Sequence, residues 1–507
     1  MKPANDTAKL IEAAQGATLD TLFRRAALGN PAKVALVDPP HRRTFADGPP
    51  RHITYAAADR VIEAIARRLH HFGLPRQSIV GLHCPNIVEG VLALLGIWRA
   101  GLIAAPLPLL WRRSDVAETL GCLGAKAIIA AGRVAGEALC DVALATAVEV
   151  FSIRYVCGFG EELPDGVVSF DELFTTDRLD PAPWPNERDN PAAEVAIVTW
   201  EITPHGRVAM ARSDTQLLAA GSAVALETEL AQDAKILTSL GLASCAGIAT
   251  SVIPWLLCGG TLLLHHGLDA QALTEQYNEY GCDVLAMPAP MAPQIAAEGL
   301  LPARPCCVLG VWQAPERAAA SPRWRDAYAK FIDVFAFGEI GLLPVQRKDG
   351  TVADFTIGPA MGAGAAAVSE IMRTRGGTMA VRGPMVPVRP FAERGLGSAV
   401  LAADAAGFVD TGYPCRVDGR TGVVTISGPP AGMVNVGSYR FVQRDLQSVL
   451  DPIGGSAALA AVPDPLLSYR IVGSADDRRA AQAALAQRGA NALMVSAFRE
   501  RRRPRAA

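Results

Sequence analysis

The 507-residue sequence has no strong charge of either sign: its formal net charge is −2, and 19% of its residues are charged. Such a balance creates no overall field that would attract nucleic acid. The one basic run, Arg499 to Arg505, is short and is interpreted as a solvated segment. Half of the residues are hydrophobic, which excludes a chain that is disordered throughout. We therefore expect a globular protein without a nucleic-acid partner.

Paired cysteines and metal-binding spacings are also missing. The ten cysteines form no CxxC pair and no cluster with histidine at metal-ligand spacing. Most of them, such as Cys122, Cys245 and Cys258, stand among apolar residues and are interpreted as reduced core residues. Residues 1–20 contain no continuous apolar segment of the signal-peptide type. These features together predict a cytoplasmic protein.

One long uncharged run occurs, over residues 241–264 (GLASCAGIATSVIPWLLCGGTLLL). Its length would suffice to cross a bilayer. However, Pro254 and the pair Gly259-Gly260 interrupt it, and two histidines follow directly. Because these residues break a helix, we expect a buried helix, a turn and a strand, and no membrane span.

The first third of the chain alternates between helix and strand patterns. Apolar residues recur at helical spacing over Tyr55 to Phe72 and over Val88 to Ala100, and each stretch is followed by a glycine. Short apolar runs at Ser78 to Cys84 and Leu102 to Pro106 are typical of buried strands. This βαβ rhythm predicts a mostly parallel sheet covered by helices, the α/β class.

The rhythm returns after residues 158–193, a stretch rich in Pro, Asp and Gly that we interpret as a surface crossing. The expected elements are strands at 196–200, 236–240, 283–287 and 332–336 and a helix at 214–226. Beyond Gly358, short alternating strands (TMAVRG, GVVTISG) predict a small β-rich subdomain. From Gln443 onward the pattern indicates a short α+β tail.

The order of these segments resembles the adenylate-forming family of acyl-CoA synthetases (AMP-dependent synthetases/ligases), luciferases and peptide-synthetase adenylation domains. The resemblance runs from about Thr18 to Val472 and is most specific at Pro85, Asn86, Gly101 and Pro106. It implies a large layered N-terminal domain over residues 1–428, with the β-rich subdomain at about 358–428, and a shortened C-terminal domain over 429–507. In that family ATP, magnesium and a carboxylic acid bind between the two domains, and an acyl-adenylate passes its acyl group to a thiol.

The phosphate loop that the resemblance implies is degenerate. Such a loop needs small residues and a final lysine, whereas the sequence here is VTWEITPHGRVAM. Thr203, Gly206 and Arg207 are nucleotide-binding remnants, and Arg207 either replaces the lysine or belongs to an ordinary surface turn. Glu201 stands where a small residue belongs and would repel a triphosphate. If the nucleotide site is lost, we expect Glu201 at the mouth of the loop with no lysine to neutralise it.

The aromatic-Gly-x-Thr-Glu motif is reduced to Phe335 through Glu339, with Gly338 in place of the threonine. The resemblance makes Glu339 the remaining candidate for a catalytic residue and a magnesium ligand. Its alternatives are a helix N-cap or a surface acid. The Thr-Gly-Asp motif that binds ribose ends here in Tyr413. Asp410 could replace the lost carboxylate, but we expect its side chain on the opposite face of an extended segment.

The remaining functional segments also depart from the family. Pro429 and Pro430 stand where the family has an arginine and an acidic hinge residue, and no Pro-Lys-x-x-x-Gly-Lys segment follows. The resemblance places a substrate pocket at Ser244, Gly247, Ala289 and Gly310, among small and apolar residues. An ordinary packed core would have the same composition.

These losses favour an acyl-CoA synthetase-like protein with weak or lost ATP-dependent carboxylate activation, a pseudoenzyme that acts as an acyl-ligand-binding or partner subunit. The first alternative is an active acyl- or aryl-acid CoA ligase whose nucleotide contacts are rebuilt from Arg207, Glu339 and Asp410. The second is a transferase that uses a preformed acyl thioester. ATP and magnesium are expected only if the protein is active, and the ligands are a carboxylic acid, an acyl thioester or a protein partner.

Overall fold

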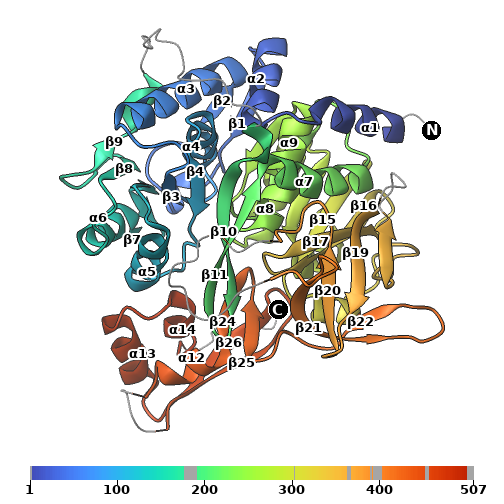
Figure 1. The fold of residues 1–507 in the computed structure, drawn as a ribbon. Helices are drawn as coiled ribbons and strands as arrows, with labels where there is room; N and C mark the ends of the chain where they lie inside the picture. The colour runs from blue at the N-terminus through green and yellow to red at the C-terminus, as the bar shows by residue number, and fades with distance from the viewer. Residues whose placement is uncertain are drawn as a thin grey trace.

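The computed structural model describes residues 3–175, 191–301, 303–361, 367–388, 391, 402–451 and 456–499. Residues 176–190 of the predicted surface crossing and residues 500–505 of the basic run lie outside these ranges. Figure 1 shows two broad sheets with helices around them, a smaller antiparallel sheet, and the C-terminal elements, in orange to red, below β10 and β11.

The first sheet contains the predicted N-terminal βαβ units. Its strands, in order, are β11 (Gly206–Ser213), β10 (Val195–Thr203), β4 (Ile103–Pro106), β3 (Ile79–His83), β5 (Ala127–Ala131), β8 (Tyr155–Phe159) and β9 (Val168–Ser169). All neighbours are parallel except β10 and β11, which form an antiparallel hairpin. Helix α4 (Val88–Arg99) follows β3, and helix α5 (Arg113–Leu123) follows β4. The short strands β6 (Arg133–Val134) and β7 (Glu137–Ala138) pair with each other, and helix α6 (Leu139–Glu149) follows β7.

The second sheet has a parallel centre and antiparallel edges. Its strands, in order, are β17 (Gly341–Gln346), β16 (Ala329–Phe337), β15 (Cys306–Trp312), β14 (Val284–Pro288), β12 (Lys235–Thr238), β13 (Thr261–Leu264), β1 (Val34–Val37) and β2 (His52–Thr54). The edge strands β17 and β2 are antiparallel to their neighbours. Strand β15 is buried along its whole length, as its continuous apolar sequence predicts for a strand covered on both faces. Helices on this part of the fold include α1 (Pro3–Ala14), α2 (Leu19–Gly29), α3 (Tyr55–His71), α7 (Asp214–Thr228), α10 (Ala270–Tyr280) and α11 (Ala292–Ala297).

The uncharged run at 241–264 folds as helix α8 (Cys245–Thr250), helix α9 (Val252–Cys258) and strand β13. Gly259 ends α9 with a left-handed φ of 62°, which favours glycine. The predicted helix, turn and strand are therefore confirmed, with the helical part divided in two. In the described part of the chain, no helix has both the length and the apolar character that a bilayer-spanning helix requires.

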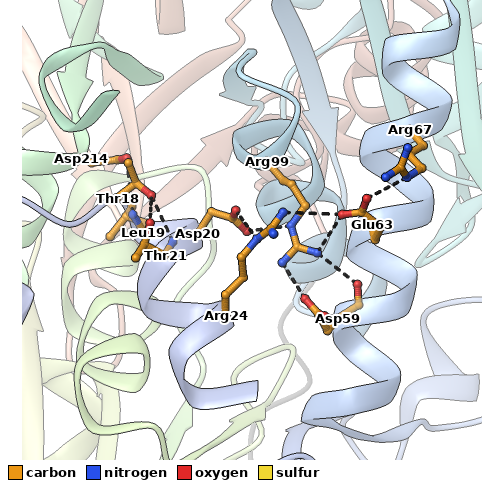
Figure 2. A network of polar contacts seen from close by, with 10 residues as sticks. All are labelled: Thr18, Leu19, Asp20, Thr21, Arg24, Asp59, Glu63, Arg67, Arg99 and Asp214. Atoms are coloured by element: carbon orange, nitrogen blue, oxygen red, sulfur yellow. Dashed lines mark hydrogen bonds and ion pairs between the residues drawn. The ribbon is translucent and has the colours of Figure 1, made fainter. Parts of the chain in front are cut away.

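Arg99, at the end of α4, connects three helices. Its side chain is 1% exposed and lies between carboxylates of α2 and α3 (Figure 2). Nε donates to Asp20 at 2.8 Å, Nη2 to Asp59 at 2.7 Å and Nη1 to Glu63 at 3.4 Å. Arg24 contacts the outer side of Asp20 at 2.9 Å. Because α4 is buried along its length, a charge at its end requires such partners.

The remaining elements form two smaller units. An antiparallel sheet is built from β18 (Gly358–Met361), β19 (Ala367–Arg373), β20 (Thr378–Arg382), β21 (Val409–Val417) and β22 (Val424–Ile426). The C-terminal elements are β23 (Met433–Val436), β24 (Tyr439–Val442), α12 (Gln443–Ser448), β25 (Ala458–Asp464), β26 (Ser468–Ser474), α13 (Arg478–Gln487) and α14 (Ala492–Ser496). They share a small core of their own that includes Phe441, Ile471 and Phe498. The layered α/β part with a β-rich sheet and a short α+β end is the predicted architecture, and the boundary at residue 428 stays a prediction.

Candidate functional site

The degenerate phosphate loop is a tight hairpin. Strand β10 was predicted to end at Trp200 but extends to Thr203. Thr203 pairs with Gly206, so only two residues make the turn. The Thr203 hydroxyl donates to the Gly206 carbonyl at 2.9 Å and accepts from the His205 N–H at 3.2 Å. The two strands pair with each other along the ladder up to this turn, so the segment is extended on both sides of it. This segment therefore offers a turn in place of a wide loop whose N–H groups could surround a phosphate.

Arg207, the candidate replacement for the lysine, points to helix α5. Its guanidinium forms ion pairs with Asp115 and, at 2.5 Å, with Glu118. It also lies 5.4 Å from the centroid of the Trp111 ring. Both described acidic partners come from α5, so the cation is neutralised at the outer side of the hairpin.

Glu201 lies inside the protein. It is 3% exposed, and one carboxylate oxygen accepts the backbone N–H of Glu339 while the other forms an ion pair with Arg440 of β24. Burial raises the pKa of Glu201 above its usual range, and the Arg440 charge opposes that shift. We expected no lysine to neutralise Glu201; the cation beside it is an arginine of the C-terminal hairpin, which that expectation did not consider.

Arg440 is the centre of a polar cluster. Nε donates to the Asn435 side chain at 2.9 Å and Nη2 donates to the Tyr413 hydroxyl at 2.8 Å, in addition to the Glu201 pair. The Asn435 amide donates in turn to the Gln313 carbonyl at 2.6 Å. Burial disfavours the charged guanidinium, but Glu201, Tyr413, Glu339 and Glu316 together more than offset this, and the pKa of Arg440 lies above its ordinary value. We call Glu201, Tyr413, Asn435 and Arg440 the hairpin cluster.

Tyr413 occupies the position of the ribose-binding aspartate. Its side chain is fully buried, and burial raises its pKa to about 12, with Arg440 opposing the shift. The phenol therefore stays protonated at neutral pH and contacts Arg440 and Asn435. Asp410, the candidate replacement, is exposed and accepts from the Thr378 hydroxyl at 2.8 Å and the Gly412 N–H at 2.9 Å.

Gly338 and Glu339 follow β16 in the reduced aromatic-Gly motif. Gly338 has a left-handed φ of 58°, and a Cβ there would lie 2.6 Å from one Glu201 carboxylate oxygen and closer still to the other. Glu339 is 8% exposed and accepts the N–H of Cys245, the first residue of α8, at 2.9 Å. Ser244 caps the same helix by accepting the Gly247 N–H at 3.1 Å. Of the alternatives for Glu339, the geometry matches an acceptor at a helix N-terminus.

A cavity with a free volume of about 70 Å³ lies between β10, the start of α8 and the C-terminal hairpin. Pockets for drug-sized ligands measure roughly 300–1,000 Å³, so this cavity holds a few waters or a small group. Its lining residues are Pro108, Trp111, Trp200, Glu201, Ile202, Ala243, Ser244, Gln313, Gly338, Glu339, Asn435, Ser438, Tyr439 and Arg440.

Only some of the predicted site residues meet at this cavity. Ser244, Gly338 and Glu339 line it, whereas Thr203, Gly206, Arg207, Asp410, Gly247, Ala289 and Gly310 do not. The last three pack in the interior: a Cβ on Gly310 would lie 2.9 Å from the Phe331 ring and 3.0 Å from the Ala289 Cβ. Among the described residues, no group of three or more His, Cys, Asp or Glu side chains is arranged to hold a metal ion.

Sequence reasoning missed Arg440, Asn435 and Gln313 as site residues. Two of them stand in the segment VNVGSYRFVQRDLQSVL, which has no acidic residue within five positions of Arg440 on its N-terminal side to indicate a buried ion pair. One signal in the sequence could have led to Arg440. Glu201 is a lone carboxylate in an apolar strand, and such a group requires a buried cation somewhere else in the chain.

The comparisons with known proteins place this architecture among the adenylate-forming enzymes. Mycobacterium smegmatis MbtA in its apo form has a TM-score of 0.62 at 21% identity, over 96% of this chain and 92% of that chain. A double mutant of o-succinylbenzoate CoA synthetase (MenE) from Bacillus subtilis gives 0.64 at 14% identity, over 89% and 87%. The anthranilate CoA ligase AuaEII in complex with anthranoyl-AMP gives 0.64 at 15%, over 90% and 86%. The chain therefore has the adenylate-forming fold.

Sequence comparison adds a more particular assignment for part of the chain. Residues 23–193 match the family described as AMP-binding enzyme. A 129-residue segment is 30% identical to the nonribosomal peptide synthetase agiA of Aspergillus flavus and covers 25% of this chain and 2% of that protein. The chain thus spans only a small part of that curated relative. Together with the fold, these matches confirm the resemblance to adenylate-forming acyl-CoA synthetases and adenylation domains.

Proposed function

We propose that this chain is an acyl-CoA synthetase-like protein that has little or no ATP-dependent carboxylate activation and acts as an acyl-ligand-binding or partner subunit. The observation that carries the proposal is the buried pair of Glu201 and Arg440, which stands between the hairpin that replaces the phosphate loop and the C-terminal hairpin. A triphosphate at this place would have to displace a paired arginine and lie against a carboxylate.

Electrostatics supports the loss of nucleotide binding. Phosphoryl chemistry depends on positioned cations and N–H donors, because the protein must stabilise charge that spreads over phosphate oxygens. Here Arg207 is paired with two acids of α5, and Arg440 is paired with Glu201. Glu339 uses its carboxylate on the α8 N-terminus. Neither cation is available for phosphate without breaking an ion pair.

The binding half of the proposal is supported by the cavity itself. Trp111 and Trp200 form part of its wall, with ring centroids 5.7 Å apart. The Trp200 Nε1–H is buried and has no partner among the described residues, so a hydrogen-bond acceptor in the cavity would satisfy it. A small acyl group or a bound water meets this requirement.

We also propose that the protein is located in the cytoplasm, since all ten cysteines are free thiols and eight of them are buried.

The alternative is an active acyl- or aryl-acid CoA ligase with rebuilt nucleotide contacts. It is favoured by one observation, that Glu339 and Ser244 still line the same cavity. In this case ATP and magnesium would be required, with Glu339 the residue to hold the ion. The paired state of Arg207 and the surface position of Asp410 weigh against it.

Calorimetry with magnesium and ATP on the purified protein separates the two functions. We expect no binding tighter than about 100 μM, which corresponds to roughly −5.5 kcal/mol. Tighter binding would overturn the proposal.

Substitution of Glu339 by glutamine tests the alternative directly. In an active ligase, Glu339→Gln should lower pyrophosphate release at least tenfold, because one contact to developing charge is typically worth about 2.7–4 kcal/mol. We expect the unmutated protein to release no pyrophosphate with fatty or aromatic acids. The glutamine retains an acceptor for the Cys245 N–H, so the variant should remain folded.

A further inference from the structure

We propose that the hairpin cluster is a latch that fixes β23 and β24 against the N-terminal part of the chain. A protein that alternates between domain orientations would need a mobile contact at this place. This inference rests on the proposed function, because a latch in this place excludes the nucleotide. Its four side chains come from β10, β21, β23 and β24, so they connect segments as much as 239 residues apart.

Burial makes the central ion pair a strong positional constraint. The side chains of Arg440 and Glu201 are 10% and 4% exposed. Moving β24 away would leave the Glu201 carboxylate in the interior without its ion-pair partner, with the Glu339 N–H as its remaining hydrogen bond and the Arg212 charge nearby. A buried charge that loses its partner is strongly unfavourable, so the docked position is maintained unless both groups become solvated together.

Neutral hydrogen bonds fix the orientation of the same hairpin. The Asn435 amide reaches the Gln313 carbonyl at 2.6 Å and the Tyr413 hydroxyl at 3.3 Å. The Tyr413 hydroxyl also accepts a hydrogen bond from Arg440 Nη2, at 2.8 Å. Because the guanidinium is planar and its donors have fixed directions, these contacts determine rotation as well as distance.

A second attachment comes from the segment before α14. The Asn491 amide, just before α14, donates to the carbonyl of Leu110 at 2.7 Å. A rotation of the C-terminal elements would have to break this bond and the hairpin cluster at the same time. The elements are thus held by this bond as well as by the cluster.

The cluster also gives one explanation for three departures from the family pattern. Glu201 replaces a small phosphate-loop residue, Tyr413 replaces the ribose-binding aspartate, and Gly338 replaces a threonine. Glu201 and Tyr413 both contact Arg440, and Gly338 leaves the space that the Glu201 carboxylate fills. Three unrelated substitutions would not be expected to lie together around the ion pair of Glu201 and Arg440. The geometry points to a single interaction that took the place of the nucleotide contacts.

Hydrogen exchange tests the latch on the whole chain without any nucleotide. In Arg440→Ala and in Glu201→Gln, we expect the amides of residues 433–442 to exchange at least tenfold faster, while the amides of β14 and β15 keep their rates. The double variant should exchange no faster than the faster single variant, because both changes remove the same interaction. Arg440→Lys keeps the charge but not the planar donors, so its exchange rates at residues 433–442 should lie between those of the unmutated protein and those of Arg440→Ala.

The control is Arg444→Ala, four residues further along the chain, whose ion pair with Asp445 is 70% and 59% exposed. It should leave exchange at 433–442 within twofold of the unmutated protein. Unchanged exchange in both Arg440→Ala and Glu201→Gln would overturn the latch, as would an equal effect in Arg444→Ala. Glu201→Gln preserves shape and gives a second folded variant if Arg440→Ala unfolds. The two failures are distinguishable: unchanged exchange overturns the latch and leaves the calorimetric test untouched, whereas ATP binding by the unmutated protein overturns the proposed function and, with it, the exclusion of the nucleotide by the latch.

Discussion

Gly338 and Glu201 depend on each other at the scale of single residues. The left-handed backbone at Gly338 favours glycine, and the space next to its Cα is filled by the Glu201 carboxylate. The threonine that the family has here would need this space for its side chain. The absence of that threonine is therefore a packing requirement of Glu201 as well as a lost functional group.

Gly338→Ala should lower the free energy of unfolding by about 2–4 kcal/mol, the sum of an unfavourable φ and a clash with a buried carboxylate. In the background of Glu201→Ala the clash disappears, so the same substitution should cost only about 1 kcal/mol. Urea denaturation of the four proteins gives both values.

Gly419→Ala is the matched control, because nothing lies within 4 Å of the added Cβ. It should change stability by less than about 0.5 kcal/mol. Equal costs for Gly338→Ala in the two backgrounds would show that the residues are not coupled.

At the scale of elements, buried charges decide how the helices are placed. Helix α4 is buried at every position and still carries Glu89 and Arg99. Glu89 accepts from Arg42 at 2.7 and 2.9 Å, and Arg99 meets three carboxylates of α2 and α3. Apolar packing alone is non-directional, so these ion pairs specify which neighbours α4 contacts.

Arg99→Met should destabilise the protein by about 2–3 kcal/mol. The value lies below the 3–5 kcal/mol typical of a fully buried pair, because Asp59 is 42% exposed and can be hydrated. Arg24→Ala, which removes a partly exposed arginine from the same carboxylates (Figure 2), should cost less than about 1 kcal/mol. Chemical denaturation measures both, and similar losses for the two variants would contradict a special role of Arg99.

At the scale of the whole molecule, buried titratable groups make stability depend on pH. Burial lowers the pKa of His83 and of His265 to about 4, and burial together with Glu89 raises the pKa of Asp38 to about 6. Histidines that are depressed when folded bind protons in the unfolded state first, so their contribution is lost as pH falls from about 6.5 to 4. Asp38 acts in the opposite direction, since its folded form gains a proton as pH falls from about 6 to 4.

His266, whose pKa burial also lowers to about 4, acts with His83 and His265, whereas the raised pKa of Glu201 acts with that of Asp38. We expect the three histidines to dominate, so the free energy of unfolding should fall between pH 7 and pH 4. Thermal unfolding at pH 7, 5.5 and 4.5 checks the sign. Asp38→Asn should steepen the fall, because the opposing group is then absent. A melting temperature that rises on acidification would contradict the assignment of His83 and His265 as buried neutral groups.

The sequence by itself determined the elements and their order. Apolar spacing predicted α3, α4, β3 and β4 to within one or two residues, and Gly259 and Gly260 separate helix from strand in the run at 241–264 as predicted, whereas Pro254 lies inside α9 and the helical part is divided at Ser251. Such features arise from interactions between near neighbours, which a linear pattern records.

Only the tertiary structure decided which side chains contact one another around the cavity. The sequence contains a buried acid, Glu201, and a basic residue, Arg440, but nothing local connects positions 239 residues apart. It likewise gave no reason why Arg207 turns to Asp115 and Glu118 of α5, or why Gly247 and Gly310 lie in packed interior. Side-chain partners of this kind depend on which surfaces the folded sheets bring together, and this is set by packing of the whole chain and not by the periodicity of any segment.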